Sequence, residues 1–196
     1  MIIKCYNEHH PYLLFVDLEF FSNKTQNKTN NHLVQFSGLL FQWIDDETYQ
    51  LMRSCNEYVT DKVCYPFVEY TSITNSFLVE NGVPLPDMVA SITEDFLRDI
   101  PLQEVLVISH GLKNDRMVML ENGLNLSNIN GQPIDGYCTF ENARKILKRQ
   151  NNLTLQDIAL ECGYYLHQAH NAYNDTWAEV AIYTYLKKIE QQQKGE

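Results

Sequence analysis

The chain has 196 residues, of which 44% are hydrophobic and 12% aromatic, and its formal net charge is −10. This length and composition favour one domain with a substantial buried core, and they exclude a disordered, collagen-like or low-complexity protein. The acidic balance excludes a protein that coats nucleic acid through bulk positive charge. It leaves open an enzyme that grips phosphates through bound metal ions.

The first part of the chain predicts strands. Residues 12–16 are apolar and end at a charge, which is typical of a short buried strand. Residues 22–32 are polar and aperiodic, which predicts an exposed loop. Residues 33–44 predict a second strand, bent at Gly38, and after an acidic turn residues 49–58 are expected to pair back as a hairpin.

The rest of the chain predicts helices and one further buried strand, at residues 105–109. Thr154 suits the first position of a helix, and Gly123 and Gly163 suit helix ends. Residues 164–174 are expected to form a loop. The expected helices cover residues 71–79, 88–97, 115–122, 140–150, 154–162 and 175–189. This order of elements predicts an α/β fold in which helices flank a mixed β-sheet.

The N-terminal residues lack the layout of a signal peptide, and no apolar run reaches the roughly 18 residues that a membrane span needs. The five cysteines are odd in number and show no Cys-x-x-Cys spacing, which argues against a zinc finger and a disulfide scaffold. We therefore expect a cytoplasmic protein with reduced thiols and no membrane association.

Asp17 and Glu19 follow the apolar run of the first predicted strand. Side chains alternate along a strand, so these two carboxylates are expected on one face. Like charges held side by side repel unless a cation lies between them, and carboxylate oxygens suit Mg²⁺ or Mn²⁺. The pair therefore indicates a metal site, although an Asp-x-Glu spacing is weak evidence when it stands alone.

Two further motifs strengthen this interpretation. His110 and Asp115 follow the strand at 105–109, and His170 precedes Asp175 with four residues between them. With Asp-x-Glu ahead of them, these motifs make the sequence resemble the DEDDh family of 3′–5′ exonucleases. The resemblance covers nearly the whole chain, from about residue 12 to 188, and it implies a ribonuclease H-like fold in one exonuclease domain, residues 1–196.

The resemblance also implies a mechanism. It assigns Asp17, Glu19, Asp115 and Asp175 as ligands of two divalent ions, Mg²⁺ or Mn²⁺, and His170 as the general base. The substrate would be single-stranded RNA or DNA with a free 3′ hydroxyl, and the products nucleoside 5′-monophosphates. Two rival functions stay open: a proofreading subunit of a DNA polymerase, and a module of the same fold that binds nucleic acid or a partner without cutting.

Histidine and aromatic residues near these motifs are the expected substrate contacts. His110 lies as far before an Asp as His170 does, so spacing alone does not separate them; we expect His110 to support the site, and His167 is a weaker competitor for the base. Leu18 and Phe20 are expected to contact substrate together with His110. One of Phe20 and Phe21 is expected to stack on the terminal base, unless both rings belong to the core.

The sequence departs from the family pattern at two places. Phe20 stands where many members have Thr, and Gly111 stands where many have Asn. Neither departure removes a metal ligand, but both leave the subgroup undecided. A basic stretch at residues 144–149 is expected to be a solvated helix face, with contact to a nucleic-acid backbone as the alternative.

Overall fold

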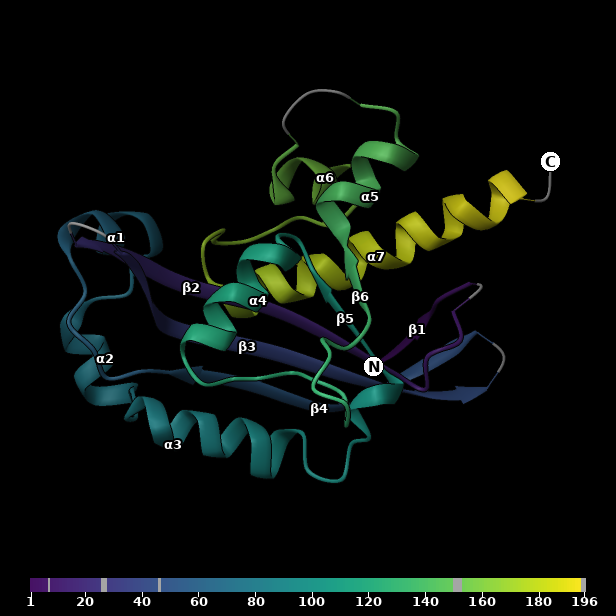
Figure 1. The fold of residues 1–196 in the computed structure, drawn as a ribbon. Coiled ribbons are helices and arrows are strands. Elements are labelled where there is room, and N and C mark those ends of the chain that lie inside the picture. The colour runs from purple at the N-terminus through teal and green to yellow at the C-terminus, as the bar shows by residue number, and fades with distance from the viewer. Residues whose placement is uncertain (7, 26–27, 46, 150–152, 195–196) are drawn as a thin grey trace.

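The computed structural model describes residues 1–196 except 7, 26–27, 46, 150–152 and 195–196. The described residues form a six-stranded sheet in the order β1-β4-β3-β2-β5-β6 (Figure 1). The strands are β1 (Ile2–Lys4), β2 (Tyr12–Thr25), β3 (Lys28–Asp45), β4 (Thr48–Tyr58), β5 (Val105–Ser109) and β6 (Gly136–Cys138). Pairing is antiparallel from β1 through β2 and parallel between β2, β5 and β6, which is the predicted ribonuclease H-like mixed sheet.

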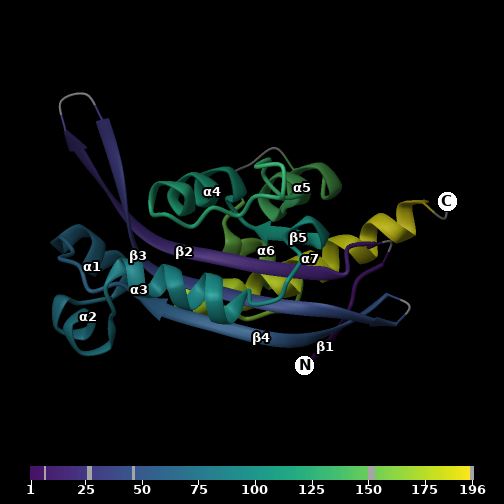
Figure 2. The same cartoon turned by 60° about the horizontal axis from the view of Figure 1, so that its bottom comes forward.

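Helices cover both faces of this sheet. They are α1 (Tyr65–Thr71), α2 (Asn75–Asn81), α3 (Leu85–Ala90), α4 (Leu112–Glu121), α5 (Thr139–Ile146), α6 (Leu155–Glu161) and α7 (Ala172–Lys194). Helix α7 crosses one face and carries α5 and α6 on its outer side, whereas α3 lies on the opposite face (Figures 1 and 2). Helices α1 and α2 lie together at one end of the sheet.

Strand β2 contributes to a core on each face because its side chains alternate. Leu13 and Phe15 pack with α7 residues such as Tyr183, and all three side chains are fully buried. Leu14 and Val16 point the other way and pack with residues of α3 and α4. The period-two pattern of the strand therefore fixes which face each side chain of β2 takes.

Gly38 allows close packing in the second of these cores. A Cβ atom at this position would lie 2.8 Å from Cε1 of Phe96, so only glycine leaves room for that ring. Phe96 ends a π-helix, Ser91–Phe96, that continues α3. The strand register is regular at Gly38, and the glycine serves this close contact with the Phe96 ring.

The predicted loop at residues 22–32 is wrong over its described part. Strand β2 continues to Thr25 and β3 begins at Lys28, so the two strands form a long hairpin that stands out from the sheet (Figure 2); residues 26–27 lie outside the described residues. Ser22, Asn23 and Thr29 of this ribbon are exposed. The apolar alternation that identifies a half-buried strand is therefore missing from its sequence.

The expected helix at residues 71–79 is replaced by α1 and α2, which meet at a break. Ser72 adopts a left-handed backbone with φ 63°, which ends α1. Thr74 then begins α2, because its hydroxyl accepts a hydrogen bond from the backbone N–H of Phe77 at 3.1 Å. Thr74 lies inside the expected helix, and its capping hydrogen bond shows that a second helix begins there.

Other boundaries differ by a few residues. The strand at 105–109 is confirmed, and Thr154 caps α6 through a reciprocal capping box with Asp157. Helix α7 begins at Ala172 within the expected loop, and β1 and β6 were missed, since three residues are too short to show a period. The expected helix 140–150 ends at Ile146, and its residue 150 lies outside the described residues. Among the described residues no helix is both long and apolar enough to cross a membrane.

Candidate active site

Strand β2 places Asp17 and Glu19 on the face that α7 covers. They continue the row begun by Leu13 and Phe15, so both carboxylates point toward the first turn of α7. Glu19 is only 8% exposed, and a β-bulge follows it before Phe20. The predicted placement of this pair at the end of a buried stretch is therefore observed.

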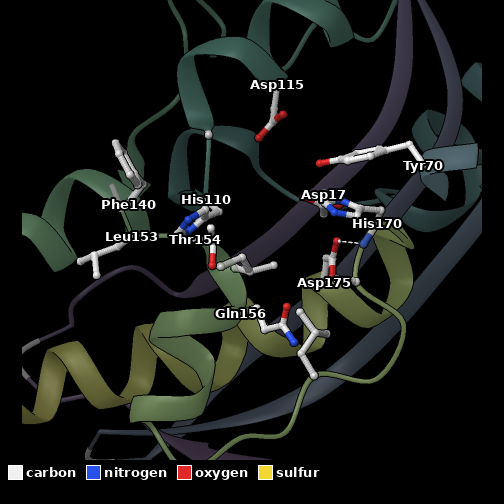
Figure 3. A pocket seen from close by; sticks show the side chains of 14 residues that line it. Asp17, Tyr70, His110, Asp115, Phe140, Leu153, Thr154, Gln156, His170 and Asp175 are labelled. Carbon is white, nitrogen blue, oxygen red and sulfur yellow. Dashed lines mark hydrogen bonds between the residues drawn. The ribbon is translucent and has the colours of Figure 1, made fainter. Parts of the chain in front are cut away.

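The start of α7 supplies the next two groups. The Asn171 side chain caps the helix by accepting from the Asn174 backbone N–H at 3.4 Å. His170, just before the cap, has a left-handed backbone with φ 66°, and its N–H donates to Oδ2 of Asp175 at 3.0 Å (Figure 3). A non-glycine residue at such a φ is strained, which is common at functional sites.

Gln35 fixes this helix start against the sheet. Its side chain is fully buried on β3 opposite Glu19, and its Oε1 accepts from the Ala172 N–H at 3.1 Å. Its amide nitrogen donates to Asn56 and Tyr58 on β4. No motif pointed to Gln35, because an isolated glutamine in a strand carries no recognisable spacing.

The turn after β5 supplies Asp115. The Gly111 carbonyl accepts from the N–H of Asp115 at 3.2 Å, so this carboxylate sits in the first turn of α4. The Ser109 hydroxyl donates to Oδ2 of Asp115 and itself accepts from the N–H of Gly111. Asp115 is 7% exposed, so its carboxylate is largely shielded from solvent.

These segments enclose one cavity of about 530 Å³. Asp17, Asp115, Asp175 and His170 all line it, and Figure 3 shows their side chains directed into a common space. The remaining lining residues are Tyr70, His110, Gly111, Phe140, Leu153, Thr154, Leu155, Gln156, Leu166 and Ala169. Three acidic groups therefore share one cavity with aromatic, aliphatic and neutral polar side chains.

The four carboxylates resist ionisation in this arrangement. Burial, followed by the charges of Asp175 and Asp115, raises the pKa of Glu19 to about 8. Burial raises the pKa of Asp115 and of Asp175 to about 6, against opposing hydrogen bonds from Ser109 and His170. The pKa of Asp17 lies well above its ordinary value, through burial and the charges of Asp115, Asp175 and Glu19. Positive charge placed between these groups would relieve their repulsion.

Two observations indicate that the residues fit a divalent cation. Potential ligand atoms of Glu19, His170 and Asp175 all lie within 4.8 Å of one another. Oδ1 of Asp175 is buried and has no hydrogen-bond partner among the described residues. A buried oxygen without a partner is costly, and a cation held by these oxygens would satisfy it. Asp17 and Asp115 line the cavity together with His170 and Asp175, but they do not belong to this group of three residues.

The two histidines of the cavity differ in their surroundings. Burial lowers the pKa of His110 to about 4, with a hydrogen bond to the Leu153 backbone in opposition, and its Nδ1 lies 2.9 Å from the Thr139 hydroxyl. His170 is half-buried, and burial lowers its pKa. Only His170 is close to the carboxylates of Glu19 and Asp175. His167 is exposed, packs against Tyr165 and does not line the cavity.

Tyr70 is a cavity residue that sequence reasoning missed. It lies on α1, is 61% exposed, and its ring centroid is 3.6 Å from that of His170, with 31° between the ring planes. Figure 3 shows its hydroxyl directed over the acidic groups of the cavity. Phe140 was missed too; it packs edge-on against His110 on the other side of the cavity. Neither ring has a sequence signal, since tertiary folding alone brings α1 and α5 to the site.

The structure changes the interpretation of the expected substrate contacts on β2. The Leu18 side chain is 6% exposed and lies on the opposite face, in the core with α3 and α4, so it does not line the cavity. Phe20 packs against that same core, and Phe21 stacks on His32 with 4.8 Å between ring centroids. Neither Phe20 nor Phe21 lines the cavity, and Tyr70 takes the place expected for an exposed ring.

The basic stretch is divided between different contacts. Arg144 on α5 lies 5.7 Å from the ring centroid of Phe140. Arg149 forms an ion pair with Glu161 on α6 at 2.9 Å. Helix α5 ends at Ile146, so the expected basic helix face does not extend to Arg149.

Comparisons with known proteins find similar folds among solved nucleases. No protein-family model and no curated protein matches the sequence. Among solved structures, the chain is similar to the cell-death related nuclease CRN-4, with TM-score 0.66 and 13% identity over 93% of this chain. It is similar to the nuclease domain of 3′hExo, a DEDDh family member bound to rAMP, with TM-score 0.62 and 13% identity over 95% of this chain. It is also similar to the zinc-bound complex of E. coli Exonuclease I with single-stranded DNA, with TM-score 0.70 and 18% identity over 92% of this chain.

The extent of these matches differs among the relatives. The chain spans 94% of the 3′hExo nuclease domain, 64% of the CRN-4 chain and 41% of the Exonuclease I chain. At these identities the likeness establishes a shared fold. The fold implied by the motifs is therefore confirmed, and the solved structures that share it include 3′-exonucleases.

Proposed function

We propose that this protein is a metal-dependent 3′–5′ exonuclease that removes nucleoside 5′-monophosphates from single-stranded RNA or DNA. The observation that carries the proposal is that Asp17, Asp115, Asp175 and His170 line one cavity. Glu19 joins them through potential ligand atoms that lie within 4.8 Å of those of His170 and Asp175. These residues come from β2, α4 and the start of α7, which are far apart in the sequence. The fold is the one found in solved 3′-exonucleases, which supports the same chemistry.

The carboxylates would hold two divalent ions, Mg²⁺ or Mn²⁺. When bound, such ions supply a water of lowered pKa and stabilise the charge on the departing 3′ oxygen. The protein supplies the oxygens that fix these ions and a cavity that limits water around them. The overall charge of −10 is then no obstacle to a phosphate substrate.

His170 is placed to take the proton of the attacking water. Burial lowers its pKa, so its ring is neutral at physiological pH and one nitrogen can accept a proton. The hydrogen bond from its N–H to Asp175 and the stacked ring of Tyr70 hold it beside the acidic groups of the cavity. A role as a metal ligand beside the carboxylates competes with this one, because a ring nitrogen of His170 lies within 4.8 Å of carboxylate oxygens of Glu19 and Asp175.

The cavity walls suit the end of a single strand. Its volume of about 530 Å³ is in the range of small-ligand sites, which is roughly 300–1,000 Å³. Tyr70 and Phe140 offer aromatic faces on which bases stack irrespective of sequence. These features favour a terminal nucleotide over the middle of a duplex as the group that enters.

A digestion panel tests the proposal. The purified protein is incubated with labelled single- and double-stranded RNA and DNA in Mn²⁺, in Mg²⁺ and in EDTA, and products are separated by size. We expect mononucleotides from single strands with metal and none in EDTA. Full activity in EDTA, or no cleavage of any substrate by a folded and metal-loaded protein, would reject the function.

A further inference from the structure

Glu179 is a buried acid that the proposed reaction does not use. It lies on α7 and is 0% exposed, although a carboxylate is rarely buried without a partner. Its Oε2 has no hydrogen-bond partner among the described residues. It does not line the cavity, so it is not placed to touch substrate.

The other oxygen of Glu179 holds the turn that carries Asp115. Oε1 accepts a hydrogen bond from the backbone N–H of His110 at 2.6 Å. The next N–H of this turn, that of Gly111, donates to the Ser109 hydroxyl, which in turn donates to Asp115. Without Glu179 the N–H of His110 would lose the partner that the structure gives it, and the turn would lose its tie to α7.

Glu179 therefore links two separate parts of the site. It follows Asp175 by four residues on α7, so both side chains lie on the same face of that helix. Through Glu179 the helix that carries Asp175 is bonded directly to the turn that carries Asp115. The two carboxylates otherwise belong to segments about 60 residues apart in the chain.

We propose that Glu179 is a positioning residue that clamps the turn after β5 to α7 and so sets the separation of Asp115 from Asp175. Glu179 accepts the hydrogen bond from the His110 N–H, and this function does not require a charged carboxylate. This inference rests on the metal centre of the proposed function. Groups that orient metal ligands typically contribute roughly 10–100-fold to metal affinity.

Two substitutions separate the clamp from the charge. Glu179→Gln keeps an oxygen that can accept from His110, and we expect Mn²⁺ affinity within about threefold of the parent. Glu179→Leu keeps similar bulk without an acceptor, and we expect a loss of roughly 10–100-fold. Mn²⁺ binding is measured by calorimetry or by electron paramagnetic resonance on the full chain. Glu190→Leu, on the same helix and beside Lys187, is the matched control and should bind as the parent does.

Each outcome decides between the alternatives. An equal loss of Mn²⁺ affinity in both Glu179 variants would mean that the carboxylate itself is needed. Parental Mn²⁺ affinity in Glu179→Leu would show that Glu179 does not position the metal ligands. If Glu179→Leu does not fold, hydrogen exchange in Glu179→Gln decides instead: the His110 amide should stay as protected as in the parent, and loss of that protection with unchanged Mn²⁺ affinity would overturn the clamp. A parent that binds Mn²⁺ but cuts no nucleic acid would reject the proposed function and leave this comparison intact.

Discussion

His110 and His170 line one cavity, yet their contacts assign them different tasks. His110 is engaged through its ring with Thr139 and through its main chain with Glu179, which suits a structural support. The His170 ring packs against Tyr70, and its potential ligand atom lies within 4.8 Å of those of Glu19 and Asp175. Equal spacing in the sequence leaves the two histidines equivalent, and the approach of the His170 side chain to Glu19 and Asp175 favours His170 as the base.

Replacing His170 tests its role as the base. His170→Ala should lower turnover by roughly 10²–10⁴-fold, the usual contribution of general acid–base catalysis, with Mn²⁺ affinity almost unchanged. His110→Ala should do less. Turnover is measured by release of mononucleotides and affinity by calorimetry. A parallel loss of Mn²⁺ affinity in His170→Ala would make it a ligand, and a larger effect of His110→Ala would reassign the base.

Asp17 should be essential for turnover and dispensable for folding. Its carboxylate is crowded by Glu19, Asp115 and Asp175, so Asp17→Asn removes a ligand and also removes repulsion. We expect no detectable mononucleotide release, together with a melting temperature in EDTA equal to or above that of the parent. Near-normal cutting by the folded variant would exclude Asp17 from the centre.

At the scale of elements, α1 is the part of the site that the sequence did not reveal. A helix was expected at 71–79, but Tyr65–Thr71 precedes it and brings Tyr70 onto His170. The periodic and capped elements were predicted well, because a buried strand such as 105–109 and the cap at Thr154 show locally in sequence. Contacts made by tertiary folding, such as those of Tyr70 and Gln35, leave no local pattern.

The ring contact between Tyr70 and His170 predicts how turnover depends on pH. Burial lowers the pKa of His170, and Tyr70 covers one face of its ring. Tyr70→Ala should expose the ring and raise that pKa toward its ordinary value, so the acid limb of the rate profile should move to higher pH. The profile of kcat is recorded across the histidine range for both proteins, with Tyr65→Ala as the control for an exposed α1 tyrosine. An unmoved limb would mean that Tyr70 does not shield His170.

For the whole molecule, the acidic site should make stability depend on pH when metal is absent. The folded-state pKa of Glu19 is about 8, above its ordinary value of 4.5, so the native state holds a proton that the unfolded chain has released. Stability contributed by this proton falls as pH rises and is lost above about pH 8.

Thermal unfolding in EDTA at about pH 6.5 and about pH 8.5 checks this expectation. The parent should lose more stability between the two conditions than Glu19→Gln does. The variant provides the control because other groups that titrate, including the buried Cys5 and Cys55, are common to both proteins. Equal losses would show that the protonation of Glu19 does not change between the two pH values, which would contradict a pKa of about 8. Saturating Mn²⁺ should reduce the difference between the two proteins.

The polarity of digestion tests the proposed 3′–5′ exonuclease activity most directly. The parent in Mn²⁺ is given three single strands of the same sequence: a linear one with a 3′ hydroxyl, a linear one with a 3′ phosphate, and a closed circle. We predict that the first is shortened stepwise from its 3′ end to 5′-monophosphates, while the second resists and the circle stays intact. Cleavage of the circle, or equal attack on the 3′-phosphorylated strand, would contradict 3′–5′ exonuclease action by this site.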